Sequence, residues 1–190
     1  MQEVGMQESS ERIILGIDPG TNLMGYGIVQ GKGKTPIYMD MGVVDLRKAG
    51  DHYMKLRRIY ENTLELIEKY LPDEVALEAP FFGKNVQSML KLGRAQGVAM
   101  AAVLSRDVPV TEYAPRKIKL AITGAGDASK EQVAGMLARM FNLKEIPKNL
   151  DATDGLAVAV CHFYEGKLKQ NKSGSSSWDD YIRKNPGRVK

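Results

Sequence analysis

Cysteine is almost absent from this chain, since the 190 residues contain only Cys161. A single cysteine excludes a disulfide within the chain and is typical of proteins from reducing compartments. No stretch approaches the roughly 20 apolar residues that a membrane-spanning helix needs, and residues 1–10 lack the apolar core of a signal peptide. The sequence therefore predicts a cytoplasmic protein with no membrane partner.

Aromatic residues are also few, at 7% of the sequence, but the apolar share of 43% is ordinary for a globular protein. A chain of this length can bury one full core, so we expect one domain. Lysine and arginine number 27 against 23 acidic residues, which gives a net charge of +4. This modest basic excess favours a polyanionic partner without requiring one.

The two ends of the chain differ in composition from its middle. Residues 1–10 are polar and are predicted to be a disordered extension. Residues 167–190 combine a glycine–serine run with many basic residues, which predicts a flexible basic tail. The folded domain is therefore expected to span residues 11–166.

Alternating apolar residues predict three consecutive strands near the start of this domain. From Glu11 to Asp18, Ile13, Leu15 and Ile17 share one face. Two further strands are expected at 25–30 and 37–44, joined by short turns as in an antiparallel meander.

Helical spacing of apolar residues then alternates with short β-type runs. Helices are predicted at 54–70, 86–106, 115–122, 129–141 and 151–164, and strands at 74–78 and 108–113. The fold class is therefore α/β, with a mixed five-stranded sheet flanked by helices on both faces.

Four carboxylates stand at the ends or starts of these elements. Asp18 ends the first strand, Glu78 ends the fourth, and Asp151 and Asp154 begin the last helix three residues apart. Several oxygen ligands on rigid elements are what a hydrolase with two hard divalent cations needs. The set predicts a Mg²⁺ site with two ions, for which Mn²⁺ is an expected substitute, whereas the lack of thiolates disfavours Zn²⁺.

Each acid also has an ordinary structural interpretation. An aspartate before Pro-Gly often only forms a turn, and a glutamate at a strand end is often only solvated. Acids in a first helical turn commonly cap free N–H groups. The hypothesis of a metal site rests on the four acids together.

Several residues near the acids are suited to bind nucleic acid. Phe81 and Phe82 are adjacent aromatics in a loop, where a ring can stack on a base or pack under the long helix. The candidate phosphate contacts are Lys84, Lys91, Arg94, Arg116, Lys117, Lys119 and Lys130, although most lysines are merely solvated.

Three further features favour structural roles. His162 lies in an apolar helix and is predicted to pack in the core. Cys161 is also predicted to pack, because no histidine or acid stands in a pattern that would mark it as a nucleophile. The helix at 86–106 carries a stripe of glycines and alanines, which allow another backbone to approach closely. We expect some of these small residues to pack on the sheet and the others to contact a second subunit.

With these residues assembled, the sequence resembles the RuvC family of Holliday-junction resolvases. The matching stretches, in the family's order, are 14–22, 25–27, 77–81, 84–97, 112–119 and 151–157. The resemblance implies an RNase H-like fold, a homodimer, and a Mg²⁺-dependent endonuclease that cuts four-way junction DNA symmetrically.

The resemblance also implies roles for particular residues. Asp18, Glu78, Asp151 and Asp154 match the four acidic positions of the family. Phe81 matches an aromatic that contacts the junction, while Lys119 and Lys130 match basic positions near the scissile phosphate. A branch-migration complex, RuvA–RuvB, is a candidate partner.

Other functions remain open from the sequence. An ATPase of the actin and sugar-kinase type has a similar first phosphate loop but needs two such domains. A non-catalytic junction-binding protein would gain only repulsion from four acids. An RNase H-type nuclease acting on hybrids is the closer alternative.

Overall fold

The computed structural model describes residues 11–80, 85–145, 147 and 149–173, with side chains described up to 166. The predicted DNA contacts Phe81, Phe82 and Lys84 lie outside the described residues, as do the N-terminal extension 1–10 and residues 174–190.

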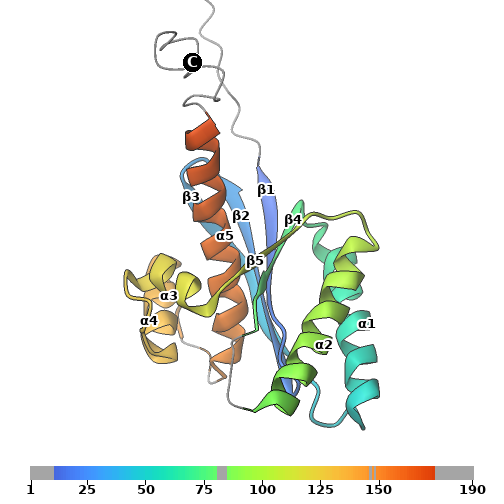
Figure 1. The fold of residues 1–190 in the computed structure, drawn as a ribbon. Helices are drawn as coiled ribbons and strands as arrows, with labels where there is room; N and C mark the ends of the chain where they lie inside the picture. The colour runs from blue at the N-terminus through green and yellow to red at the C-terminus, as the bar shows by residue number, and fades with distance from the viewer. Residues whose placement is uncertain (1–10, 81–84, 146, 148, 174–190) are drawn as a thin grey trace, which may run out of the picture.

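A five-stranded mixed sheet forms the centre of the domain, in the order β3-β2-β1-β4-β5 (Figure 1). The first three strands are antiparallel neighbours, and β4 and β5 run parallel to β1. This confirms the predicted meander and the predicted mixed sheet. The strands are β1 (Arg12–Asp18), β2 (Leu23–Lys32), β3 (Thr35–Asp45), β4 (Glu74–Glu78) and β5 (Val110–Tyr113).

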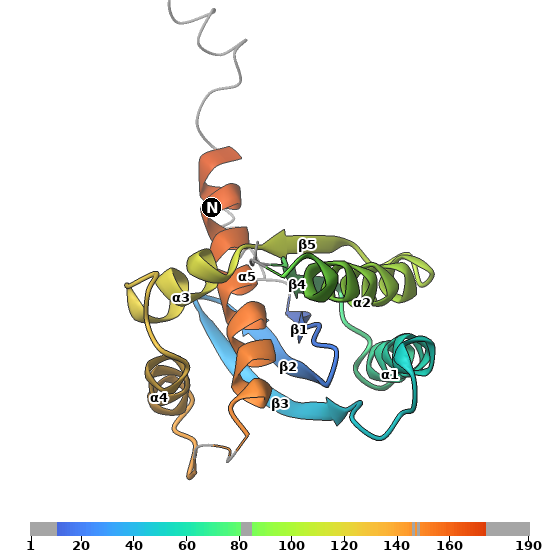
Figure 2. The same ribbon diagram turned by 60° about the horizontal axis from the view of Figure 1, so that its bottom comes forward.

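Helices cover both faces of this sheet, as predicted (Figure 2). One face carries α1 and α2, and the other carries α5 with α3 and α4 packed against it. The helices are α1 (His52–Tyr70), α2 (Val86–Leu104), α3 (Pro115–Thr123), α4 (Lys130–Met140) and α5 (Asp151–Ser173).

The alternation of β1 divides the core into two layers. Leu15 and Ile17 pack on the side of α1 and α2, whereas Ile14 packs on the side of α5. Because side chains alternate along a strand, Asp18 belongs to the same face as Ile14. The β4 strand repeats this division, so Ala76 and Glu78 also face the α5 layer.

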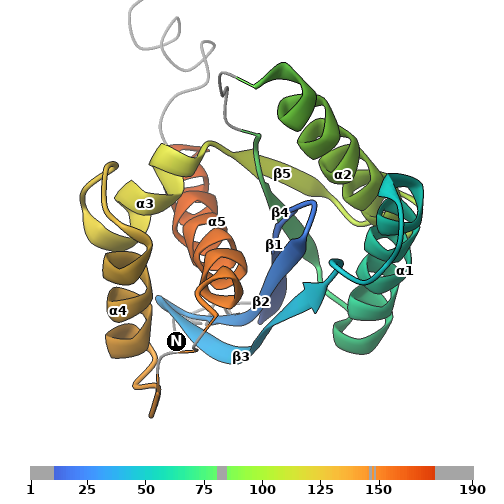
Figure 3. The same cartoon turned by 90° about the horizontal axis from the view of Figure 1, so that it is seen from below.

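The direction of the strands decides where the helices begin. Since β1 and β4 are parallel, their last residues, Asp18 and Glu78, lie at the same edge of the sheet. The helices α1, α2 and α5 also begin at this edge, at the bottom of the view in Figure 1 and towards the viewer in Figure 3. Side chains from distant parts of the sequence are thereby brought to one edge.

Close contact between α5 and the sheet depends on glycine. A Cβ added to Gly155 of α5 would lie 2.4 Å from Cα of Tyr26 on β2. A Cβ added to Gly25 would lie 2.0 Å from the carbonyl oxygen of Asp151. Only glycine therefore permits the first turns of α5 to approach β2 this closely.

His162 is buried, as predicted, within a polar network inside the α5 layer. Its Nδ1 atom lies 2.9 Å from the hydroxyl oxygen of Tyr113, and its Nε2 atom contacts the carboxylate of Glu74. Arg12 donates to the same carboxylate over 2.9 Å. Buried polar groups are costly unless they are paired, and this network pairs them.

The last helix is longer than predicted. It continues past Tyr164 and ends at Ser173, so the predicted boundary at 166 falls inside α5. A Cβ added to Gly166 would lie 2.8 Å from an Nη atom of Arg12, so the glycine lets the helix pass close to this side chain rather than ending it. None of the described helices is long and apolar enough to cross a membrane.

Candidate active site

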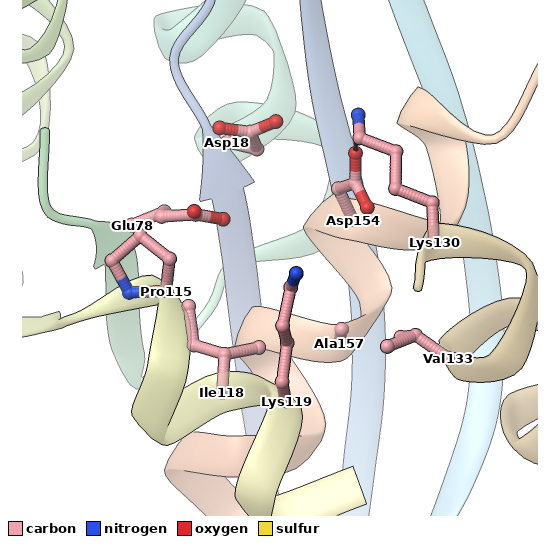
Figure 4. Close-up of a pocket in the computed structure, with 9 residues that line it drawn as sticks. All are labelled: Asp18, Glu78, Pro115, Ile118, Lys119, Lys130, Val133, Asp154 and Ala157. Atoms are coloured by element: carbon pink, nitrogen blue, oxygen red, sulfur yellow. Dashed lines mark hydrogen bonds and ion pairs between the residues drawn. The ribbon is translucent and has the colours of Figure 1, made fainter. Parts of the chain in front are cut away.

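Three of the four predicted acids converge on one cavity at the edge where β1 and β4 end. Asp18 and Glu78 follow paired residues of neighbouring parallel strands, Ile17 and Leu77. Asp154 approaches from the first turn of α5. All three carboxylates line a cavity of about 250 Å³, and Figure 4 shows Glu78 and Asp154 on opposite sides of it with Asp18 at the end of β1.

Two lysines lie in the same cavity. Lys119 comes from α3 and Lys130 from the start of α4, and both side chains line the cavity with the acids (Figure 4). Lys130 Nζ donates to Asp154 Oδ2 over 2.5 Å and to Asp151 Oδ1 over 3.0 Å. Both lysines are therefore placed where a phosphate entering the cavity would meet them.

Asp151 lies beside the cavity without lining it. Its only described side-chain ion pair is with Lys130, which connects it to Asp154. The two acids belong to one turn of α5, as their spacing of three predicts. Lys130 thus links Asp151 to the cavity.

The carboxylates of Asp18, Glu78 and Asp154 are buried and lie close to one another, which raises their pKa values. Burial, reinforced by the charge of Asp154, raises the pKa of Asp18 to about 6. Burial and the charge of Asp18 raise the pKa of Glu78 to about 8. Burial also raises the pKa of Asp154, although its hydrogen bond from Lys130 opposes the shift. The site therefore holds more negative charge than its surroundings stabilise.

The same carboxylates stabilise the positive charge of Lys130. Burial by itself lowers the pKa of an ammonium group, but the hydrogen bonds to Asp154 and Asp151 raise the pKa of Lys130 above its ordinary value. Lys130 therefore carries a positive charge at any physiological pH and offsets part of the negative charge of the acids.

The remaining walls of the cavity are apolar and were not singled out by the sequence. They are formed by Pro115 and Ile118 of α3, Val133 of α4 and Ala157 of α5. Ile118 and Val133 occupy buried positions of their helices, so helical periodicity marks them only as core residues. Apolar walls exclude water and strengthen electrostatic interactions inside the cavity.

The donor set fits a hard divalent cation. Carboxylate oxygens are the preferred ligands of Mg²⁺, and no cysteine or histidine lines the cavity. As the side chains stand, no three acidic, histidine or cysteine residues in the described ranges are arranged to share one ion. The ammonium group of Lys130 pairs with two of the carboxylates, and burial raises the pKa of Asp18, Glu78 and Asp154. A divalent cation would stabilise the charged form of these acids.

The other predicted contacts are distributed differently. Arg94 is exposed on α2 and does not line the cavity, so the structure does not bring it to the acids. Gln96 of α2, which the sequence did not single out, donates to the carbonyl oxygen of Glu78 over 3.4 Å and also to the carboxylate of Glu112. Gln96 thus ties the end of β4 to β5 and α2.

Comparison with known proteins agrees with this geometry. The family model for the Crossover junction endodeoxyribonuclease RuvC matches residues 14–162. A protein of that name from Bacteroides fragilis is 63% identical over 187 residues, covering 97% of this chain and 100% of the relative. One from Christiangramia forsetii is 62% identical, covering 95% of this chain and 94% of the relative.

Solved structures show the same similarity. The structure described as Thermus thermophilus RuvC in complex with a Holliday junction substrate aligns with a TM-score of 0.77 at 32% identity. It covers 83% of this chain and 96% of the other. The yeast mitochondrial resolvase Ydc2, with a TM-score of 0.59 at 14% identity, shares the fold.

The sheet order and the similar solved structures define the fold as RNase H-like, and the matched relatives define the class as nuclease. Within that class, the family match and the close relatives cover nearly the whole chain. The chain belongs to the RuvC family of crossover junction endodeoxyribonucleases.

Proposed function

We propose that this chain is a structure-selective endonuclease that resolves four-way (Holliday) DNA junctions by paired, symmetric nicks during recombination and repair. The observation that carries the proposal is the convergence of Asp18, Glu78 and Asp154 with two lysines in one cavity. Family membership supplies the substrate, because the Thermus thermophilus relative is described in complex with a Holliday junction.

The catalytic residues in this proposal are Asp18, Glu78, Asp151 and Asp154, which would hold two Mg²⁺ ions, or Mn²⁺ as a substitute. When bound, the ions supply the positive charge that activates water and stabilises the leaving 3′ oxygen. Asp18 is the best candidate to bind both ions, because it lies at the end of the central strand β1 between Glu78 and Asp154 (Figure 4).

The lysines and the apolar walls have separate roles. Lys119 points into the cavity and offsets charge on the phosphate (Figure 4). Lys130 stabilises Asp151 and Asp154 before the cations bind and then becomes available to the phosphate. Ile118 and Val133 exclude bulk water, which strengthens each of these interactions.

The wider DNA surface is proposed from the family pattern. Phe81 and Phe82 would contact the unpaired centre of the junction, and Lys84 and Arg94 would contact its backbone. Only Arg94 belongs to the described residues, and its exposed position on α2 is compatible with a phosphate contact outside the cavity.

A homodimer is proposed because two symmetric nicks require two active sites. An exposed small and apolar stripe along α2 supports it, since Val86, Leu90 and Leu104 are 66%, 51% and 54% exposed. Gly93, Gly97 and Ala101 continue the stripe between them and are exposed as well. Small residues at helical spacing allow two helices to approach closely.

The cellular setting is part of the same proposal. A single cysteine suits a reducing compartment, and the protein is proposed to act in the cytoplasm. The RuvA–RuvB branch-migration complex is the proposed partner on the junction.

The test is cleavage of a synthetic four-way junction with and without Mg²⁺, beside duplex and RNA–DNA hybrid controls. Paired nicks in the junction alone are expected, and Asp18→Asn should remove them while junction binding persists. Cleavage of the hybrid instead would indicate an RNase H-type nuclease. Binding without any cut would indicate a non-catalytic junction-binding protein.

A further inference from the structure

A second cavity opens at the same edge of the sheet, on the side of α1 and α2. Its volume is about 380 Å³, and it lies between the turn that follows β1 and the first turns of the two helices. The turn is the one that leaves Asp18, so the two cavities flank the same short segment. The lining residues are Thr21, Asn22, Gly50, His52, Lys55, Ser88, Lys91 and Leu92.

The lining of this cavity carries positive charge and no carboxylate. Lys55 Nζ donates over 2.9 Å to the neutral amide oxygen of Asn22. In the described part of the chain, neither Lys55 nor Lys91 forms an ion pair with an acid. Both ammonium groups are therefore available to an anion.

The N-terminus of α2 adds to this charge. His52 and Lys55 belong to the first turn of α1, and Ser88 belongs to the first turn of α2. The N-cap of α1 is Asp51, whose carboxylate accepts from the backbone N–H of Met54 and already offsets the positive end of that helix. The N-cap of α2 is the neutral Asn85, and its first turn contains no acidic residue. A helix N-terminus favours bound phosphate, and at this cavity it is the N-terminus of α2 that keeps its positive end.

His52 lines the cavity and contains an unsatisfied polar atom. The Nε2 atom of His52 is buried and has no hydrogen-bond partner among the described residues. Nearly all buried polar atoms in folded proteins are paired, so such an atom requires an explanation. The atom is buried beneath the surface of the cavity, so a group bound there does not contact it, but the His52 ring lies close enough to respond to such a group.

We propose that this cavity binds one phosphate group of the nucleic acid backbone, as a subsite separate from the catalytic cavity. The proposal rests on the proposed function only for the source of the phosphate. Lys55 and Lys91 supply charge, and Thr21 and Ser88 supply hydrogen-bonding groups. A phosphate held here fixes the DNA against the turn that leaves Asp18 and thereby positions the strand for cleavage.

The first test uses inorganic phosphate as the probe and the histidine ring signals in NMR as the readout. The chain has only two histidines, and His162 is buried in its own network, so it serves as an internal control. The His52 signals are expected to shift saturably with phosphate, and the double variant Lys55→Gln/Lys91→Gln is expected to lose the shift. Unshifted His52 signals, or a shift that the double variant retains, would overturn the proposal.

The second test measures junction affinity without divalent metal, so that the DNA stays uncut. Removing one phosphate contact is expected to weaken binding about tenfold and to reduce the slope of log K against log salt by about 1. The matched control is Lys32→Gln/Lys34→Gln, which removes the same charge at the opposite end of the sheet. It is expected to bind with a nearly unchanged affinity and slope.

The outcomes separate this proposal from the proposed function. If the wild type binds and cuts the junction but Lys55→Gln/Lys91→Gln binds like the control, the subsite is wrong and the nuclease assignment stands. If the wild type neither binds nor cuts the junction, the nuclease assignment fails, and the phosphate titration of His52 still decides whether the cavity is an anion site.

Discussion

Lys130 reaches across from α4 and donates to Asp154 of α5, with 2.5 Å between Nζ and Oδ2. The same ammonium group lies 3.0 Å from Oδ1 of Asp151, so one lysine compensates two of the four acids. A divalent cation that binds these carboxylates must take over that role. In the proposed function, the ammonium group of Lys130 therefore holds these two acids together and would compete with the divalent cation for them.

Replacing Lys130 separates its two roles. Lys130→Met removes the competing charge, so the DNA-free protein is expected to bind Mn²⁺ about tenfold more tightly, as titration followed by electron paramagnetic resonance can measure. Junction cleavage is expected to fall, because a charge near the phosphate is lost. Lys117→Met is the control, since Lys117 pairs with Glu165 outside the cavity. Unchanged Mn²⁺ affinity in Lys130→Met would contradict the competition.

Stability of the metal-free protein is expected to depend on Glu78. Its pKa is about 8 in the folded protein and near 4.5 when unfolded. The folded state thus binds this proton more tightly, so the free energy of unfolding falls as pH rises from about 4.5 to 8. Glu78→Gln removes this penalty and is expected to be more stable than the wild type at pH 8.5 by roughly 2 kcal/mol, since repelling side chains partly move apart.

Urea unfolding in a chelating buffer at pH 4 and pH 8.5 measures this effect. The wild type and Glu78→Gln are expected to be similar in stability at pH 4, where Glu78 is protonated in both states. Glu65→Gln, an exposed change on α1, is expected to follow the wild type at both values. A wild-type stability that rises towards pH 8.5 while Glu78→Gln stays level would argue against a repulsive Glu78.

Much of the architecture follows from local patterns in the sequence. The alternation of Ile13, Leu15 and Ile17 places these residues on the α1 and α2 side, as the structure confirms. It also places Asp18 on the opposite side, because a strand has a period of two. The convergence of Asp18 and Glu78 follows once their strands are recognised as parallel neighbours.

Other features depend on contacts between distant segments and have no local signal. Lys55 and Lys91 border one cavity because α1 and α2 begin at the same edge, which neither helix specifies alone. Glycine is common at helix ends, so Gly166 suggests that the helix stops there. In the structure Gly166 instead leaves room for the Arg12 side chain, and α5 continues to Ser173. Lys130 donates hydrogen bonds to two acids only because α4 packs on α5.

The glycine contact between α5 and β2 is expected to hold the acids in place. In Gly155→Ala the new Cβ meets the backbone of Tyr26 at 2.4 Å, so α5 must shift, and Asp154 moves with it. A loss of about 1–3 kcal/mol in unfolding free energy and a clear drop in cleavage are expected. Gly135→Ala on α4 is the matched control, because its Cβ meets nothing within 4 Å. It is expected to stabilise the protein by about 0.5–1 kcal/mol.

The exposed stripe on α2 predicts how the proposed dimer is broken. Leu90 is 51% exposed, so Leu90→Glu should leave the folded subunit intact while placing a charge in the middle of the interface. Analytical ultracentrifugation is expected to show a dimer for the wild type and a monomer for Leu90→Glu, which should also lose paired nicking. Leu120→Glu, at a 54% exposed position on α3, is the control and should remain dimeric. A dimeric Leu90→Glu protein would place the interface on another surface.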